Sequence, residues 1–513
     1  DLFSETGGLS LGPVGAGAGF RWGFGAKPPL RILFEQPTVA ALTSAVAALP
    51  RDVDAETTIS RLPDSRTAPL SFAQERLWVL NQIEPDSAAY NLVAAFRIRG
   101  ALDRTALERT LTEIGGRHEA LRTVFPSTDG VARQVIKPAE PFVLSVEAGS
   151  NAQDDALTRR AAELAAEPFD LSNGPLFRGT LLRAADDDHL LVLVMHHIVS
   201  DGWSRGVLYQ EIGALSRANA SGDASPLAEF PIQYGDFAAW QRNWLSEAVL
   251  ARQLEYWTRL LAAPLPTLDL PTDRPRPPIQ TFKGATHRFE IPASLAGRLK
   301  TLGAEEDATA FMVLLAAFQA MLSRYAGQDD IVVGSPTAGR TRLETEGLIG
   351  FFVNTLALRT NLAGNPSFRT LLGRVREVSL GAFQHQDLPF ERLVEALHLP
   401  RDLSRSPLFQ TLFILQNTPV HPLALPGVVL EQVEVDAGAA KFDLTLSLAV
   451  QDGGYVGHLE YNTDLFDAAT IERLGQHYVT LLEAAAAAPD LPITRLGILT
   501  PAERHQLDRA WND

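Results

Sequence analysis

Apolar and polar residues alternate along the chain in patterns that predict helices and strands in turn from residue 70 onward. SFAQERLWVLNQI, at 71–83, has the period of an amphipathic helix, with Gln74 among the residues expected in solvent. NLVAAFRIRG, at 91–100, has the character of a strand. LLVLVM, at 190–195, is uninterrupted apolar sequence, which is typical of a strand buried on both faces.

The same alternation continues after a proline-rich segment, LPTDRPRPP at 270–278, which can be neither helix nor central strand. We interpret this segment as the crossing between two lobes, at 70–270 and 271–495. Two α/β lobes are therefore the predicted fold class. The second lobe is predicted to contain strands at 286–292, 330–336 and 351–360 and near 408–417 and 457–466, and helices at 308–327 and 368–385.

Two shorter segments precede the lobes. Residues 1–49 form a unit of their own, in which a proline begins the helical stretch PTVAAL. Residues 50–69 are polar and charged, contain three prolines and show no period, which is typical of a linker.

Composition and charge exclude several classes of partner and of site chemistry. The chain has 513 residues, of which 46% are hydrophobic and 21% charged, as expected for a globular protein with two or three folding units. A net charge of -16 argues against nucleic acid or an anionic membrane as the main partner. The absence of cysteine excludes disulfides and thiolate sites, and we expect a cytoplasmic protein because neither a signal peptide nor a long apolar run is present. The abrupt ends, at Asp1 and at AWND, predict a piece of a longer protein.

The buried strand at 190–195 runs directly into titratable residues, in the sequence HHIVSDGWS. Successive residues of a strand point to opposite faces, so we expect one of His196 and His197 to pack and the other to face a cleft. A neutral imidazole is suited to take a proton from an attacking amine or hydroxyl. Asp201 either orients a histidine or forms an ion pair elsewhere, and Gly202 permits a close approach that a side chain would block.

Other interpretations of this segment exist. Adjacent histidines at a strand end are often partly buried polar residues that bond to backbone groups. A metal site of the form His-x-x-x-Asp is disfavoured by the strand context, the lack of cysteine and the scatter of the other nine histidines. A serine triad is disfavoured because no G-x-S-x-G sequence accompanies the pair.

MHHIVSDGWS, at 195–204, resembles the H-H-x-x-x-D-G signature of the condensation domains of nonribosomal peptide synthetases. The resemblance spans about 70–490 and implies two chloramphenicol-acetyltransferase-like lobes arranged as a V, with a tunnel that a carrier-bound substrate enters from each end. Six more segments resemble other motifs of that family in the same order, at 71–80, 117–125, 234–240, 339–359, 385–397 and 401–413.

The resemblance also implies roles for individual residues. His197 is the implied catalytic residue, either as a base or as a group that positions the amine and stabilises the intermediate. Asp201 is implied to be structural and to form an ion pair with Arg340, although an arginine without the motif would be read as a surface residue. No metal is implied. The other residues of the active-site motifs are His196, Gly202, Trp203 and Asn354.

GGLSL, at 7–11, resembles the GG-x-S-L site of peptidyl carrier domains. Ser10 would then carry 4'-phosphopantetheine, attached by a phosphopantetheinyl transferase, and a serine at a helix N-terminus suits such an anion, although an ordinary N-cap serine is the alternative. The match departs from the family at Leu9, where carriers commonly have histidine or aspartate. Carrier domains have a helix after the serine, but residues 12–25 here are poor helix formers. Each of the six glycines and the one proline in this stretch lowers the stability of a helix. The match also lacks the first helix of a carrier domain, as expected if the true start of the protein precedes Asp1.

The far end, at 496–513, resembles the linker that leads to an adenylation domain. GWS and GFFVNT are similar to the subtype that accepts an L-configured donor. The implied reaction is attack of the amine of an aminoacyl thioester, on a downstream carrier, on a donor thioester of the upstream carrier, in the biosynthesis of a secondary metabolite such as a siderophore or antibiotic. The alternatives are a coenzyme A-dependent or ester-forming acyltransferase, an epimerisation domain of the same fold, and an inactive scaffold that recruits partner enzymes.

Overall fold

The computed structural model describes residues 58–64, 66–148, 154–400, 402–416, 422–436 and 438–507. The predictions made for residues 1–49, including Ser10, Leu9 and the glycine-rich stretch at 12–25, lie outside the described residues, as do residues 50–57 and 65 of the predicted linker.

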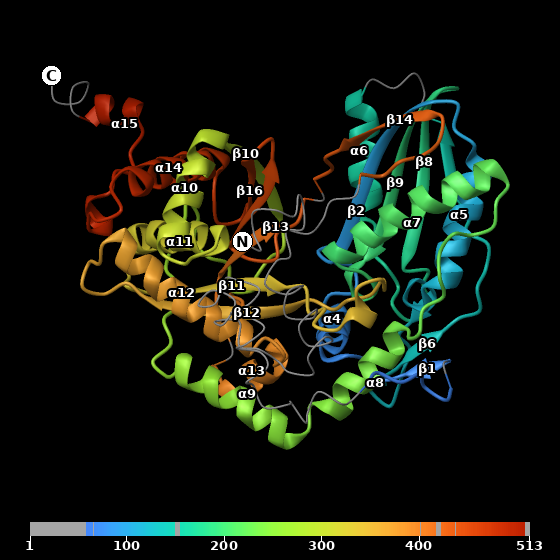
Figure 1. Ribbon diagram of the computed structural model, residues 1–513, viewed down its shortest axis with the longest axis horizontal. Helices are drawn as coiled ribbons and strands as arrows, with labels where there is room; N and C mark the ends of the chain where they lie inside the picture. Colours follow the sequence, from blue (N-terminus) through green and yellow to red (C-terminus); the bar gives the residue numbers. More distant parts are fainter. Residues whose placement is uncertain are drawn as a thin grey trace, which may run out of the picture.

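The first lobe is built on a five-stranded sheet with the strand order β14-β2-β9-β8-β7. Its inner strands are antiparallel, and β7 joins β8 in parallel. The strands are β2 (Asn91–Gly100), β7 (Ser145–Ala148), β8 (Phe177–Ala185), β9 (Asp188–His196) and β14 (Val428–Val433). Since β14 pairs with β2, the second half of the chain supplies an edge strand to the sheet of the first lobe, as Figure 1 shows.

Helices cover both faces of this sheet. Leu191, Leu193 and Met195 of β9 pack in one cluster with side chains of α5 (Arg104–Arg117) and α7 (Gly202–Ser221). The alternate residues Leu190, Val192 and Val194 pack in another cluster, with α6 (Asp154–Ala166). The apolar run at 190–195 is therefore a strand buried on both faces, as predicted.

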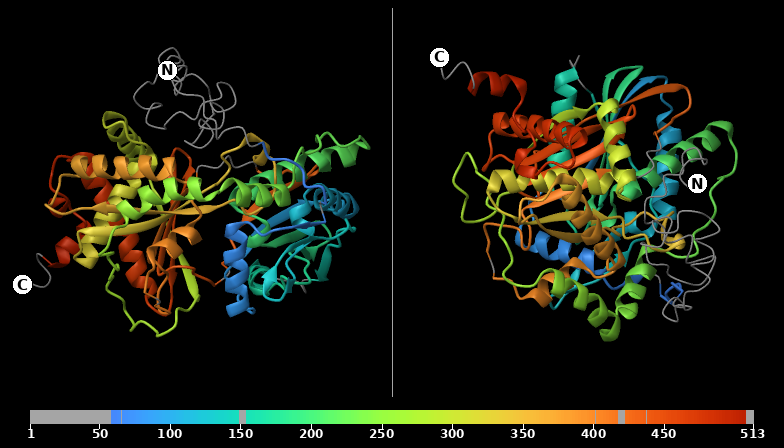
Figure 2. Two further views of the ribbon diagram at one scale, coloured as in Figure 1. Left: turned by 90° about the horizontal axis from the view of Figure 1, so that it is seen from below. Right: turned by 60° about the vertical axis from the view of Figure 1, so that its left-hand side comes forward.

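The second lobe is built on a six-stranded sheet with the order β10-β16-β15-β13-β11-β12. Helices α10 (Ala293–Glu305), α11 (Ala310–Ala326), α12 (Phe368–Gln384) and α14 (Ala468–Ala487) lie on the side of it that is turned away from the first lobe (Figures 1 and 2). The strands are β10 (Gly284–Ile291), β11 (Asp330–Thr337), β12 (Asn354–Asn361), β13 (Thr411–Gln416), β15 (Leu444–Gln451) and β16 (Gly454–Asn462).

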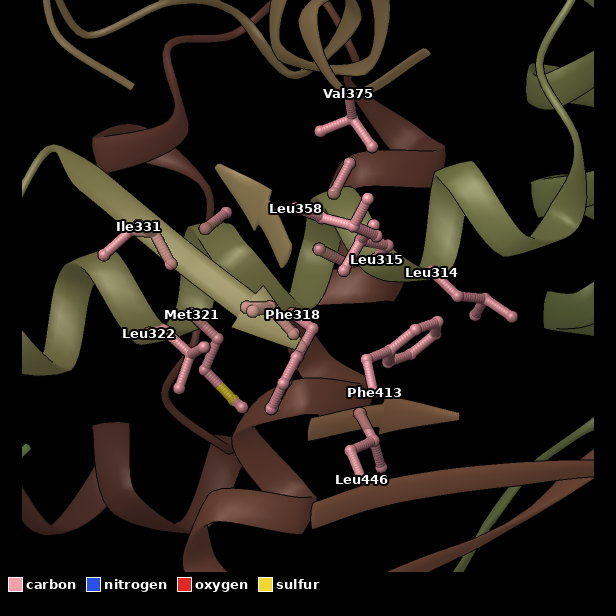
Figure 3. Packing of buried hydrophobic residues seen from close by; sticks show 14 of the residues in the cluster. Leu314, Leu315, Phe318, Met321, Leu322, Ile331, Leu358, Val375, Phe413 and Leu446 are labelled. Carbon is pink, nitrogen blue, oxygen red and sulfur yellow. The ribbon is translucent and has the colours of Figure 1, made fainter. Parts of the chain in front are cut away.

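The core of the second lobe lies between this sheet and α11. Phe318 of α11 packs among Leu358 of β12, Phe413 of β13 and Leu446 of β15 (Figure 3). On the opposite face of the sheet the cross-strand neighbours Arg288, His458 and Ser447 remain at least partly exposed. Alternation along the strands therefore gives this sheet one apolar face and one polar face.

The lobes are joined through helices at one side of the molecule. α8 (Tyr234–Trp244) packs against the first lobe, and Trp257 of α9 (Glu247–Leu260) lies in the core of the second lobe, where its indole donates to the carbonyl of His385 at 2.9 Å. The chain thus enters the second lobe before the proline-rich segment at 270–278, which we had interpreted as the crossing. That segment contains neither helix nor strand, as predicted.

The other helices and strands are mostly short, and one of them, the helix α4 (Phe72–Ile83), lies between the two lobes (Figure 1). No single described helix is both long and apolar enough to span a membrane, and α10 and α11 meet that test only as a pair bent by 103°. The remaining elements are β1 (Thr67–Ala68), α4 (Phe72–Ile83), η2 (Glu119–Arg122), β3 (Thr123–Val124), β4 (Ser127–Thr128), β5 (Val131–Ala132), β6 (Gln134–Ile136), η3 (His197–Val199), η4 (Leu343–Thr345), α13 (Phe390–Leu397), η5 (Ile493–Arg495) and α15 (Pro501–His505).

Candidate active site

The two signature histidines lie where β9 ends. His196 is the last residue of the strand, and His197 begins the 3-10 turn η3, so the two rings diverge. The His196 ring is only 3% exposed, packs edge-on against Phe169 and accepts the backbone N–H of Ile198 at Nδ1, at 3.1 Å. His196 is therefore the histidine that packs.

His197 is half-buried, and one of its ring nitrogens is bonded to no described residue. Its Nδ1 lies 2.8 Å from the carbonyl oxygen of Ser200, and since a carbonyl can only accept, Nδ1 carries the hydrogen and Nε2 carries the lone pair. The ring meets Phe351 edge-on at 4.7 Å between centroids, and the backbone N–H donates to the carbonyl of Tyr90 at 2.8 Å. Burial, followed by the positive charge of Lys441, lowers the pKa of His197 to about 3, so the ring is neutral at cellular pH.

Asp201 and Arg340 form a buried ion pair between the lobes. Asp201 begins α7, and its Oδ1 accepts from the backbone N–H of Ser204 at 2.8 Å and from Arg340 at 3.2 Å. Its Oδ2 accepts the backbone N–H of Phe352 at 3.0 Å. Arg340 is 1% exposed, so it is not a surface residue, and its guanidinium lies 4.1 Å above the Phe352 ring. Both carboxylate oxygens are thus occupied, and neither bonds to a histidine of the described chain.

The second lobe reaches into the first through residues 346–352, called here the bridging segment. Trp203 donates its indole N–H to the carbonyl of Glu346 at 2.9 Å. The Ser204 hydroxyl accepts the N–H of Gly350 at 3.1 Å. Tyr234 donates to the carbonyl of Phe351 at 2.5 Å, which places the Phe351 ring beside His197.

His118, from the RHEALRTVF motif, also holds the bridging segment. It is fully buried, with Nδ1 accepting the N–H of Ile349 at 3.2 Å and Nε2 3.0 Å from a carboxylate oxygen of Glu211. Because Nδ1 accepts, Nε2 is the nitrogen that carries a hydrogen toward Glu211. The motif therefore contributes a lobe contact that the sequence analysis did not assign.

Gly202 and Asn354 differ in what surrounds them. Gly202 is the exposed first residue of α7, and a Cβ there would meet no described atom within 4 Å. Asn354 donates to the carbonyls of Gln386 and Leu388, at 2.8 and 2.6 Å, and accepts the N–H of Phe390 at 3.0 Å. All of these Asn354 contacts join β12 to the start of α13.

Gln74 was expected in solvent, but it is 1% exposed. Its Oε1 accepts the N–H of Ser71, whose hydroxyl accepts the N–H of Gln74 in return, so the pair forms a capping box at the start of α4. Its amide also donates to the carbonyl of Ile198 in η3 at 3.1 Å. The Ser-x-x-Gln spacing is a sequence signal for the cap, whereas the bond to η3 depends on the tertiary structure.

Two cavities are lined by residues that lie near His197 in space or near its contacts in the chain, although His197 itself lines neither. A groove of about 460 Å³ lies between residues 84–89 and the second-lobe residues Lys283 and Ala439, and the chain continues from its walls to Tyr90 and Lys441. A smaller cavity of about 50 Å³ is lined by Phe351, Asn354 and Trp240, among others. A larger cavity of about 660 Å³, beside β7 and β8, contains none of the signature residues. In the described part of the chain, no three His, Asp or Glu side chains are grouped as a metal site.

Comparison with known proteins decides the family. A model of the condensation domain matches residues 64–508. The chain belongs to the condensation domains of nonribosomal peptide synthetases. This condensation domain is 48% identical over its whole length to one of the proteins of the linear gramicidin synthase of Brevibacillus parabrevis, of which it covers 7%. It is 41% identical to the phosphinothricin tripeptide synthetase PhsB of Streptomyces viridochromogenes, of which it covers 44%. The chain therefore spans a small part of its first relatives.

Solved structures confirm the predicted fold. The X-domain from teicoplanin biosynthesis superposes with a TM-score of 0.80 at 30% identity, covering 86% of this chain and all of that one. The first condensation domain of the calcium-dependent antibiotic synthetase, in complex with a substrate analogue, gives a TM-score of 0.72 over 85% of this chain and all of that one. At 23% identity the latter supports the fold alone. The two lobes are thus of the chloramphenicol-acetyltransferase-like kind.

Proposed function

We propose that this domain forms a peptide bond between two carrier-bound substrates. The amine nitrogen of an aminoacyl thioester attacks the thioester carbonyl of the donor, the N–C bond forms, and the C–S bond breaks to release the donor carrier's thiol. The thioester is already activated, so bringing the two ends together does much of the work. The observation that carries the proposal is a neutral His197 whose Nε2 is free of the described residues and whose ring contacts Phe351, a residue that lines one of the cavities.

The geometry favours one role for His197. A ring with a pKa of about 3 is too weak a base to deprotonate an ammonium, since α-amino groups have a pKa of about 8. We infer that Nε2 accepts a hydrogen bond from the neutral amine and takes its proton only as the N–C bond forms. Asp201 and Arg340 would act by holding η3, α7 and the bridging segment in place. His196, Trp203 and Asn354 would support this arrangement, and Gly202 would leave room for the substrate.

The partners follow from the same proposal. The donor would be carried on 4'-phosphopantetheine at Ser10, attached by a phosphopantetheinyl transferase, and GGLSL at 7–11 supports this assignment. The acceptor would come from a downstream carrier charged by an adenylation domain, to which residues 496–513 would lead. We further propose an L-configured donor, supported by GWS and GFFVNT, and a cytoplasmic location.

The test is a condensation assay with both carriers loaded. Ser10 is charged with an aminoacyl or peptidyl arm, an aminoacyl carrier is added, and the product is followed by intact-protein mass spectrometry. We expect His197→Ala to lower the rate by about 10²-fold or more, and His505→Ala, at an exposed position of α15, to leave it unchanged. Undiminished product from His197→Ala would remove that residue from the mechanism. Turnover with a free donor thioester, without need of Ser10, would favour the coenzyme A-type acyltransferase.

A further inference from the structure

A lysine from the second lobe and His197 both contact Tyr90, and no described residue accepts a hydrogen bond from the Nζ of this lysine. Lys441 lies in the segment before β15 and is half-buried. Its Nζ is 4.9 Å from the centroid of the Tyr90 ring, and the carbonyl of Tyr90 accepts the N–H of His197 at 2.8 Å. Tyr90 therefore contacts both residues, one through its ring and the other through its backbone.

The ammonium of Lys441 is not sealed inside the protein. It makes no hydrogen bond or ion pair with any residue that the structure describes, and Nζ is not among the sealed polar atoms that lack a partner. The groove of about 460 Å³ ends at Gly438 and Ala439, two residues before Lys441. The Nζ atom is thus accessible, and its hydrogen-bonding capacity is available to a ligand.

The other charges nearby leave the surroundings of His197 positive. Arg205 on α7 is a second cation whose charge lowers the pKa of His197. Arg76 on α4 is paired with Glu391 at 3.8 Å. The carboxylate of Glu460 accepts the backbone N–H of Lys441 at 3.4 Å, and burial raises its pKa. Such surroundings disfavour a protonated His197 and favour negative charge that develops beside it.

We propose that Lys441 is a catalytic residue that stabilises the negative charge on the thioester carbonyl oxygen when the amine adds. This inference rests on the proposed peptide-bond formation. As the N–C bond forms, the carbonyl π electrons move to oxygen, and the ammonium donates a hydrogen bond to that oxyanion. When the C=O bond re-forms, the sulfur leaves with the C–S electrons and receives the proton that the amine gave up. Burial lowers the pKa of Lys441 below its usual value of about 10.5, the charge of Glu460 opposes that shift, and the lysine keeps its own proton throughout the reaction.

The competing explanation is that Lys441 only packs on Tyr90. A packing residue would affect stability and not the chemical step, so the assay follows single turnover with both loaded carriers at saturation. We expect Lys441→Met to lower the first-order rate about 10²-fold without raising the KM for either carrier. Lys441→Arg, which keeps the cation, is expected to stay within about 10-fold of wild type. Lys300→Met, at an exposed position of α10, is the matched control and should be unchanged.

A second readout reports the same charge directly. The pKa of His197, followed by NMR of labelled histidine, should rise in Lys441→Met, with His196, Arg205 and Glu460 left in place as the remaining titratable groups nearby. If Lys441→Met does not fold, Lys441→Gln takes its place in both measurements. A wild-type rate in the neutral variant at saturating carriers would overturn the inference while leaving peptide-bond formation intact. Failure of the wild-type domain to form any amide would instead overturn the proposed function.

Discussion

Two contact regions between the lobes, called here joints, contain a cation of the second lobe, Arg340 in one and Lys441 in the other. The two cations differ in whether they are paired with a carboxylate. At one joint, Arg340 is buried, paired with Asp201, and bonded to backbone carbonyls of the second lobe. At the other joint, Lys441 is half-buried and its ammonium is bonded to no described residue. A buried charge that is paired with its counter-ion holds one geometry, whereas a cation without a counter-ion has its interaction energy available for a ligand. The difference indicates that the Asp201–Arg340 contact holds the lobes together, whereas the ammonium of Lys441 remains available to a ligand.

The largest effect on stability is expected at the joint formed by Asp201 and Arg340. Arg340→Met should lower the free energy of unfolding by about 3–5 kcal/mol, because it leaves the carboxylate of Asp201 buried without its partner. Urea unfolding measures this loss. Arg104→Met is the control, since Arg104 is half-exposed and pairs with Glu108 on the surface of α5, a contact of about 0.5 kcal/mol at most. If Arg340→Met lowered the free energy of unfolding by less than about 1 kcal/mol, the Asp201–Arg340 pair would not be the stabilising contact described here.

A smaller effect is expected from overpacking the bridging segment. Gly350 lies against the Tyr234 ring, so the added Cβ of Gly350→Ala would collide with it. We expect a loss of about 1–3 kcal/mol in the free energy of unfolding and a slower condensation rate, because Phe351 would shift beside His197. Gly297→Ala is the matched control on α10, where a Cβ meets nothing within 4 Å and the helix should gain up to about 1 kcal/mol. Equal stability of the two variants would contradict the contact.

The smallest effect concerns pH. Burial, with the charges of His197 and Lys441, lowers the pKa of His196 to about 3, against about 6.5 in an unfolded chain. The unfolded state therefore binds more protons below pH 6.5, and the free energy of unfolding falls as the pH drops from 6.5 toward 3. At pH 5.5 this residue should account for roughly 1 kcal/mol of the loss.

Unfolding in urea at pH 7 and 5.5 checks this prediction. His196→Asn should lose less stability between the two pH values than wild type, and His505→Asn, at an exposed site, should lose as much as wild type. Lys441→Met should also reduce the loss, because it removes one of the charges that keep His196 neutral. An unchanged pH dependence in His196→Asn would mean that His196 titrates normally in the folded protein.

The local pattern of apolar and polar residues correctly predicted several helices and strands, because their formation depends mainly on residues close in the sequence. The helices expected at 308–327 and 368–385 are α11 and α12, and the apolar run at 190–195 is the central part of β9. His196 and His197 contact different residues, as expected from the alternation of side chains along a strand, although the strand ends at His196. For the site, the motifs located Asp201 and Arg340 far apart in sequence, and their pairing rested on resemblance alone.

The sequence by itself determined which segments are helix, strand or turn and which carry the signature chemistry, because period and spacing act over a few residues. Only the tertiary structure decided that β14 pairs with β2, that α9 belongs to the second lobe, that Gln74 is buried against η3 and that Lys441 and His197 both contact Tyr90. Each of these depends on contact between segments distant in the chain. Such contacts form through packing and electrostatic interactions in the folded protein, so they cannot be predicted from a local sequence pattern.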